Sequence, residues 1–269
     1  MKSTTLFVFS ALVLLSSCNE KHDRNKGRSN WVDKVANKDH GPLREKEFNG
    51  NFDEIEVSQA IDAEIIKSDK ERVVISAPEN IINEILVDMD GEKLHIHYKP
   101  GIRVMNSHKV TAKIYAKDFT KLVANSAGEI HVKDKFTQDK TEVDVSSAGK
   151  ITGNLEANDL DISVNSSADF RGKVWAVNLD VEAASAASID VSGKAKNADF
   201  DSSSGSSISA KEVIVDHLSA DASSGASIEA SATSRVDAEA SSGGSVNIYK
   251  KGNVVVNKQQ NSGGSVNVH

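Results

Sequence analysis

The chain repeats one short pattern about every 20 residues over its C-terminal half, and this repeat restricts the possible folds more than any other feature. Each copy contains an alternating apolar and polar run, a cluster of Ser, Gly or Ala, and a closing Ile, Val or Phe, as in DASSGASIE. The closing residues are spaced by 18 to 21 positions: Ile130, Ile151, Phe170, Ile189, Ile208, Ile228, Val246 and Val266. A nearly constant period of this length is typical of a solenoid, in which each repeat is one structural unit.

The pattern within each repeat predicts β-strands. Positions ten, eight and six before the closing residue are mostly apolar, as in Leu160, Ile162 and Val164, and a spacing of two is the strand period. We therefore expect an all-β fold, a parallel β-solenoid (β-helix) with about 20 residues per coil that forms one elongated domain. Each coil should contain a strand, a tight corner, a second strand and a variable return loop. Lys258 and Gln260 occupy inward positions in the last coil and predict a polar cap.

The clusters of small residues are interpreted as stacked corners. One Ser stands four positions before each closing residue: Ser126, Ser147, Ser166, Ser185, Ser204, Ser224, Ser242 and Ser262. Small residues are expected there because a larger side chain would collide with the neighbouring corner or strain the backbone. The hydroxyls can bond to neighbouring backbone or to the next Ser. The alternative is that the clusters form a ligand-binding surface or carry glycans.

The segment before the repeats also contains strand patterns, with a looser rhythm. Alternating or β-branched runs cover residues 52–67, 72–77 and 109–115, and Asp90-Gly91 is a turn signal between two further strands. We interpret residues 47–121 as the N-terminal β region of the solenoid and residues 122–269 as the regular repeats.

The N-terminus has the order of a secretory signal. Residues 1–17 contain a basic start and an apolar run that is too short to span a bilayer as a helix. The following tetrapeptide LSSC resembles the bacterial lipobox, which implies that Cys18, the only cysteine, carries a lipid. The alternative is an ordinary secretory signal that ends near a Cys. Residues 18–46 are polar and mixed in charge and predict a flexible tether, and Asn19 favours the outer membrane by analogy with lipoprotein sorting.

The chain resembles a known bacterial family. The order FDEIEV, AIDAEI, VVISAPENIINEILVDMDGEKLHIHY and VTAKIYAKDFTKLVANSAGEI, followed by the small-residue repeats, is similar to the putative auto-transporter adhesin head GIN domain family over residues 47–269. The resemblance implies a parallel β-solenoid in a lipoprotein or secreted protein, with an adhesive role and no catalytic signature. Ala127 and Ala148 depart from the Gly that is common in the first corners of that family.

The register also predicts two columns of acidic residues on one outward face. Nine positions before the closing residues lie Glu142, Asp161, Asp180, Asp199 and Asp237, and seven positions before them lie Asp144, Glu182, Asp201, Asp221 and Glu239. Such a charged face keeps the solenoid soluble and stops the sheets of separate molecules from associating. The sharper hypothesis is a Ca²⁺ site, since Ca²⁺ takes several oxygen ligands. The candidate ligands are the densest group, Asp180, Glu182, Asp199 and Asp201.

Several function classes lack support in the sequence. There is no nucleophile elbow, P-loop or dinucleotide fingerprint, so we expect no enzyme and no resident cofactor. His95 and His97 share a strand face, but no third ligand stands at metal-binding spacing near them. The net charge of −7 and the lack of a basic stripe argue against nucleic acid as a partner. Aromatic residues suited to a sugar site are few, chiefly Trp175 and Tyr249.

The sequence therefore predicts a protein of the cell envelope that is anchored to the outer membrane by lipid. Its solenoid would bind an extracellular protein or glycan as an adhesin or surface-binding protein. The alternative is a periplasmic envelope scaffold or glycan-binding accessory lipoprotein.

Overall fold

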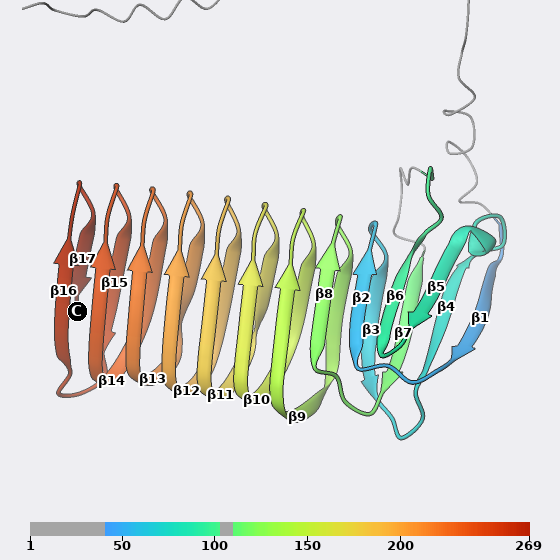
Figure 1. Ribbon diagram of the computed structural model, residues 1–269, viewed down its shortest axis with the longest axis horizontal. Helices are drawn as coiled ribbons and strands as arrows, with labels where there is room; N and C mark the ends of the chain where they lie inside the picture. The colour runs from blue at the N-terminus through green and yellow to red at the C-terminus, as the bar shows by residue number, and fades with distance from the viewer. Residues whose placement is uncertain (1–40, 103–109) are drawn as a thin grey trace, which may run out of the picture. The chain divides into compact units, whose positions relative to one another are not determined.

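Seventeen strands of the described residues, 41–102 and 110–269, form one hydrogen-bonded sheet system that winds into a parallel β-solenoid in the computed structural model (Figure 1). These residues fall in one compact unit, Lys34–His269. The elements are β1 (Leu43–Asn49), β2 (Glu54–Ser58), β3 (Asp62–Lys67), β4 (Arg72–Pro78), the 3-10 helix η1 (Ile82–Glu84), β5 (Ile85–Asp90), β6 (Lys93–Tyr98), β7 (Thr111–Ala116), β8 (Lys121–Asn125), β9 (Glu129–Val145), β10 (Lys150–Val164), β11 (Asp169–Ala183), β12 (Ser188–Ser202), β13 (Ser207–Ala222), β14 (Ser227–Ala240), β15 (Ser245–Lys250), β16 (Val255–Gln260) and β17 (Ser265–Val268). The predicted all-β solenoid is confirmed.

The coils stack in the register that the repeat predicted. Each closing residue pairs in a parallel ladder with the closing residue of the next coil, from Ile130 with Ile151 through to Val246 with Val266. All eight side chains are buried, because the ladder runs along the interior of the stack. One apolar position per coil therefore forms a continuous column of the core.

The corners are two-residue turns in which both residues have a left-handed backbone. The eight Ser residues have φ between 48° and 57°, and the residues that follow them have φ between 60° and 81°. Two consecutive positive φ angles are the geometry of a type I′ turn. Neighbouring corners are joined through the backbone, as where the N–H of Ala186 donates to the carbonyl of Ser204 (3.1 Å).

The structure corrects the reason for small residues in these turns. A Cβ atom on Gly205 or Gly225 would meet nothing within 4 Å, so the turn residues are selected by their positive φ and not by crowding. Crowding applies one residue later, where a Cβ atom on Gly244 would lie 2.2 Å from the carbonyl oxygen of Ala222. The Ser-to-Ser hydrogen bonds between coils also lie outside the two turn residues, as between Ser227 Oγ and Ser207 Oγ (3.2 Å).

The expected return loop is instead part of a continuous strand. Each strand from β9 to β14 contains 14 to 17 residues and passes through the rounded end of the coil without a break. Glycine permits the sharpest approach there, since a Cβ atom on Gly193 (φ 126°) would lie 1.9 Å from the carbonyl oxygen of Val174. Lys194 and Lys196, in the same segment, are exposed.

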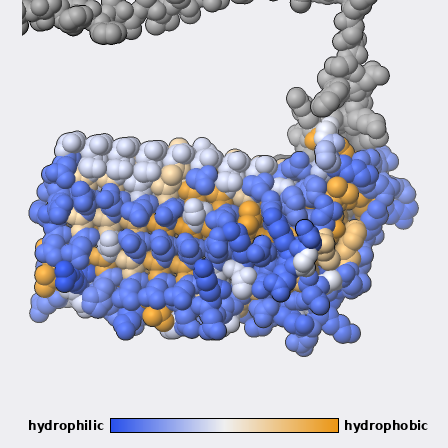
Figure 2. All heavy atoms as spheres, viewed as in Figure 1, coloured by the Kyte–Doolittle hydropathy of each residue, from blue (hydrophilic) through white to orange (hydrophobic). Residues whose placement is uncertain are grey.

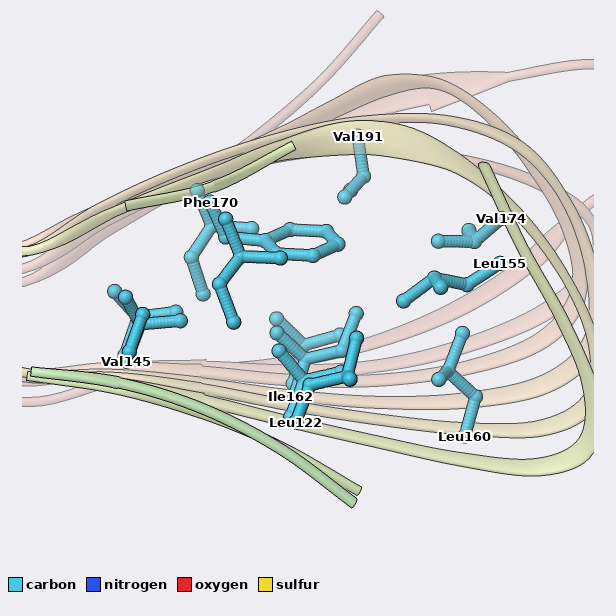
Figure 3. Packing of buried hydrophobic residues seen from close by; sticks show 14 of the residues in the cluster. Leu122, Val145, Leu155, Leu160, Ile162, Phe170, Val174 and Val191 are labelled. Atoms are coloured by element: carbon cyan, nitrogen blue, oxygen red, sulfur yellow. The ribbon is translucent and has the colours of Figure 1, made fainter. Parts of the chain in front are cut away.

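The interior of a coil is narrow and filled by one layer of apolar side chains from each wall (Figure 3). Phe170 and Val174 extend from one wall toward Ile162 and Leu160 on the other, and neighbouring coils repeat the arrangement (Figure 3). The inward position that Ile162 occupies in β10 is occupied by Ala220 in β13 and by Ala238 in β14, toward the C-terminus. Small residues therefore complete a core that needs few large side chains.

Two additional layers cover the N-terminal end of the stack. Strands β2 and β3 are joined at Gln59 and Ala60, which both have positive φ, and they pair in parallel with β8 and β9 as one more coil. Strands β6 and β7 pair in parallel with β2 and β3, and β5, β4 and β1 close the edges in antiparallel fashion. The predicted tether extended too far, because residues 43–46 belong to β1 and pair with β4.

The C-terminal coil ends the stack with polar side chains. Lys258 pairs with Ala238 and Gln260 with Ala240, so both occupy the inward register, yet both are exposed because no other coil of residues 41–102 and 110–269 covers them. Gln260 Oε1 accepts a hydrogen bond from the backbone N–H of Val266 (3.2 Å). The predicted polar cap is confirmed by this geometry.

Candidate functional site

The two acidic columns lie side by side on the face formed by the strand segments that end at the corners. We call this the acidic face. Asp180 pairs with Asp161 and Asp199, and Asp201 pairs with Glu182 and Asp221, so each carboxylate stands next to the equivalent one in the adjacent coil. Figure 2 shows rows of hydrophilic side chains along this face and a paler edge where the corners stack. The structure therefore brings together all four residues of the calcium hypothesis.

Burial and the repulsion between neighbouring carboxylates raise the pKa of several residues of the acidic face. Burial raises the pKa of Asp180 and Asp201, and the neighbouring carboxylates raise it further. Asp221 behaves in the same way, with Glu239 as its strongest charged neighbour. A raised pKa means that the folded state disfavours the ionised form.

The N-terminal end of the acidic face is neutralised by a lysine. Lys121 Nζ lies 2.7 Å from Asp144 Oδ2 and also bonds to Glu142. The hydrogen bond from Lys121 lowers the pKa of Glu142, in contrast to the acids further along. The uncompensated part of the face therefore lies over β11, β12 and β13.

A shallow groove runs beside the acidic face. It has a volume of about 340 Å³ and lies over Lys140, Leu160, Leu179 and Ala198. A ladder of amides borders it, in which Asn197 Nδ2 donates to Asn178 Oδ1 (2.9 Å) and Asn178 Nδ2 donates to Asp159 Oδ1 (2.7 Å). These polar groups form hydrogen bonds to one another between neighbouring coils, so they stabilise the stacking of the coils.

The described residues, 41–102 and 110–269, hold no group of three His, Cys, Asp or Glu side chains arranged to bind a metal ion. The carboxylates of Asp180, Glu182, Asp199 and Asp201 form a charged surface, and Ca²⁺ binding there stays a prediction.

The pair His95 and His97 lies in a polar cluster that the sequence did not reveal. Their rings are stacked with centroids 4.1 Å apart. His97 Nε2 lies 2.9 Å from Asp88 Oδ2, and His95 Nε2 lies 3.4 Å from Glu56 Oε1 and 3.0 Å from Ser58 Oγ. The acids of this cluster come from other strands, because β2 and β5 flank β6 and bring in Glu56 and Asp88.

This cluster lacks the geometry of a catalytic relay. Glu56 and Ser58 both approach Nε2 of His95, whereas a relay needs the acid at Nδ1 and the nucleophile at Nε2. Ser58 is also buried, with 5% of its surface exposed. Burial lowers the pKa of His95 and favours its neutral form. The contacts are those of a polar network that fixes β2, β5 and β6.

The two aromatic residues considered for a sugar site differ in their surroundings. The ring of Tyr249 is covered by Lys211 Nζ at 4.0 Å from its centroid and by the stacked ring of His269 at 4.9 Å. Trp175 is 46% exposed and borders a hollow in the surface.

The predicted signal peptide (1–17), the lipidation site Cys18 and residues 18–40 of the tether lie outside the described residues. Within the described part of the chain, no helix has the length and apolar character needed to cross a bilayer.

The fold places this chain among the parallel β-solenoid proteins. The family model for the putative auto-transporter adhesin, head GIN domain, matches residues 51–173 and again 150–252, and the chain belongs to this family. The predicted resemblance is therefore confirmed, and it indicates a protein of the cell envelope or surface. A comparison with curated proteins finds no match.

Solved structures share the fold at low sequence identity. A putative adhesin from Parabacteroides merdae ATCC 43184 has a TM-score of 0.80 and 20% identity, over 87% of this chain and 98% of that one. A putative adhesin from Parabacteroides distasonis ATCC 8503 has a TM-score of 0.76 and 22% identity, over 86% and 98% of the two chains. A putative lipid binding protein from the same organism has a TM-score of 0.73 and 20% identity, over 87% and 98%.

Proposed function

We propose that the protein is a lipid-anchored adhesin that binds an extracellular protein or glycan through the surface of its solenoid and has no catalytic activity. The observation that carries the proposal is the in-register stack itself, which repeats outward side chains at fixed spacing and so presents extended charged columns. A rigid surface of repeated groups suits the binding of an extended partner, because little ordering is required on association. Membership of the adhesin head domain family supports the same role.

The anchor is proposed from the sequence. Cys18 follows a short apolar run in the LSSC tetrapeptide, and lipid on this residue would hold the solenoid at the outer membrane. The polar residues after Cys18 would separate the solenoid from the bilayer.

The test is the release of the solenoid from intact cells by trypsin. The tether contains cleavage sites such as Lys26 and Arg28, so protease outside the cell should release the solenoid into the supernatant. A periplasmic marker must stay inside the same cells, and permeabilised cells serve as the control in which release occurs wherever the protein resides. Release from intact cells supports the adhesin. Protection in intact cells with release after permeabilisation would refute it and favour a periplasmic scaffold.

A further inference from the structure

A hollow in the surface lies near the rounded end of the coils, away from the acidic face. It has a volume of about 490 Å³ and is formed by β9, β10, β11 and β12. Its polar and aromatic lining consists of Lys135, Asn154, Glu156, Lys173, Trp175 and Lys194. The parallel register explains how these residues meet, since Trp175 pairs with Glu156 on one side and with Lys194 on the other.

Glycine and an inward valine shape the floor of this hollow. Gly193 pairs with Val174, whose side chain points into the core at the rounded end (Figure 3). A side chain at Gly193 would collide with the carbonyl oxygen of Val174, so the backbone is bare at this position. The hollow is therefore a consequence of the close approach between coils.

Trp175 offers an uncovered aromatic surface to this hollow. Its side chain is 46% exposed, and no aromatic or cationic group of the described residues stacks on its ring. Tyr249, the other aromatic residue considered for a sugar site, has both a cation and a ring against it. An exposed indole contributes little to the core, whereas the face of an aromatic ring attracts the polarised C–H groups of a flat ligand.

The charge of the hollow is opposite to that of the whole chain. Lys135 is paired with Glu156 (2.8 Å), but Lys173 and Lys194 form no ion pair with any described residue. Two uncompensated cations thus border the indole on a protein with a net charge of −7. Exposed amines next to an aromatic face favour a ligand that carries negative charge.

We propose that this hollow is a binding site for an acidic saccharide, one that carries carboxylate or sulfate groups. The C–H face of a pyranose ring would stack on Trp175, and Lys173 and Lys194 would bind its anionic groups. Asn154 and Glu156 would bond to its hydroxyls, because amides and carboxylates suit these groups. A few placed polar groups around an aromatic surface are typical of small-ligand sites.

This inference rests on the proposed adhesive function and names the class of its ligand. The binding test uses purified protein without cells, so its failure would remove the saccharide site and leave the trypsin-release result unaffected.

The experiment uses the full chain with Cys18→Ser and Trp31→Phe, which removes the proposed lipid and leaves Trp175 as the one tryptophan. A galacturonate hexamer and a heparin hexasaccharide are titrated separately while the fluorescence is recorded, and the neutral probe is cellohexaose. We expect a saturable change with at least one acidic probe and binding at least tenfold weaker for cellohexaose. The probe that binds distinguishes carboxylate from sulfate recognition.

Calorimetry with the acidic probe then tests the residues. Trp175→Ala and Lys194→Ala should each weaken binding at least tenfold, while the matched control Lys196→Ala, an exposed lysine of the same strand outside the hollow, should stay within about twofold of the parent. Circular dichroism checks that each variant is folded. Absence of saturable binding by both acidic probes at millimolar concentration would overturn the proposal. Equal affinity for cellohexaose, or unchanged affinity in folded Trp175→Ala, would also overturn it.

Discussion

Neutralising one carboxylate in the middle of the acidic face should stabilise the fold. Asp201 in β12 pairs with Glu182 in β11 and Asp221 in β13, and Asp199 lies two residues before it on the same strand face. Asp201→Asn keeps the size of the side chain and removes its charge. The repulsion from both neighbouring coils is thereby lost, so the variant should unfold at a higher urea concentration than the parent.

The size of the effect follows from the spacing of the coils. Two unit charges about 4.8 Å apart, the distance between neighbouring strands, repel by roughly 0.9 kcal/mol in unscreened water. Screening at physiological ionic strength, where the Debye length is about 8 Å, reduces each repulsion to about half. With two neighbours, Asp201→Asn should raise the free energy of unfolding by about 1 kcal/mol, and by only a few tenths at 1 M salt.

The effect should also depend on pH in a definite direction. Burial, Asp199, Asp221 and Glu182 raise the pKa of Asp201, so the folded state holds this proton more tightly than the unfolded chain does. The destabilisation is therefore fully present above the folded pKa and disappears as the pH falls below the unfolded value near 3.8. The advantage of Asp201→Asn should be largest at neutral pH and absent in acid.

Urea unfolding at pH 7, in low and high salt, provides the assay. The matched control is Asp190→Asn, because Asp190 pairs with Arg171 and Ser209 and has no acid beside it in the ladder. That variant should be neutral or slightly less stable than the parent. If Asp201→Asn is no more stable than the parent, or if its gain persists unchanged in 1 M salt, the electrostatic reasoning is refuted.

Three further outcomes are expected. Gly225→Val should lower the free energy of unfolding by about 1–3 kcal/mol, because a β-branched residue must adopt the positive φ of the corner. The control Lys196→Ala should change it by less than about 0.5 kcal/mol, and equal urea midpoints for the two variants would contradict this prediction. Cys18→Ser should move the protein from the membrane fraction to the soluble fraction, and unchanged fractionation would exclude the lipid anchor. If the acidic face binds calcium, millimolar calcium should raise the unfolding temperature more than sodium does at matched ionic strength. The double variant Asp199→Asn and Asp201→Asn should abolish this difference, and equal effects of the two salts on the parent would refute the prediction.

The repeated half of the fold could be predicted because the same position of each coil holds a buried apolar residue. The ladder from Ile130 to Val266 must stay apolar to fill the interior, and the corner Ser must precede it at a fixed distance. The columns of the acidic face, including Asp180 and Asp199, follow from that register alone.

The remaining features depend on contacts that a repeat does not encode. The corner at Gln59 and Ala60 has no Ser or Gly to mark it, although its φ angles match those of the later corners. Glu56 reaches His95 only through the pairing of β2 with β6, strands separated by more than 30 residues. Strand alternation places Trp175 outward between the buried Val174 and Ala176, but the hollow beside it could not be derived from the sequence, because the close approach of Gly193 to Val174 is known only from the structure.

The in-register stacking of coils forms both the acidic face and the hollow beside Trp175. A disulfide between adjacent coils tests this register most directly. Ser207 pairs with Ser227, and their Oγ atoms lie 3.2 Å apart, whereas Ser245 lies one coil further along the same ladder. In the Cys18→Ser background, Ser207→Cys with Ser227→Cys should oxidise to an intrachain disulfide, since neighbouring strands have the required Cα spacing of about 4.4–6.8 Å. Ser207→Cys with Ser245→Cys should stay reduced under the same conditions. A reduced adjacent pair, or equal oxidation of both pairs, would contradict the predicted stack.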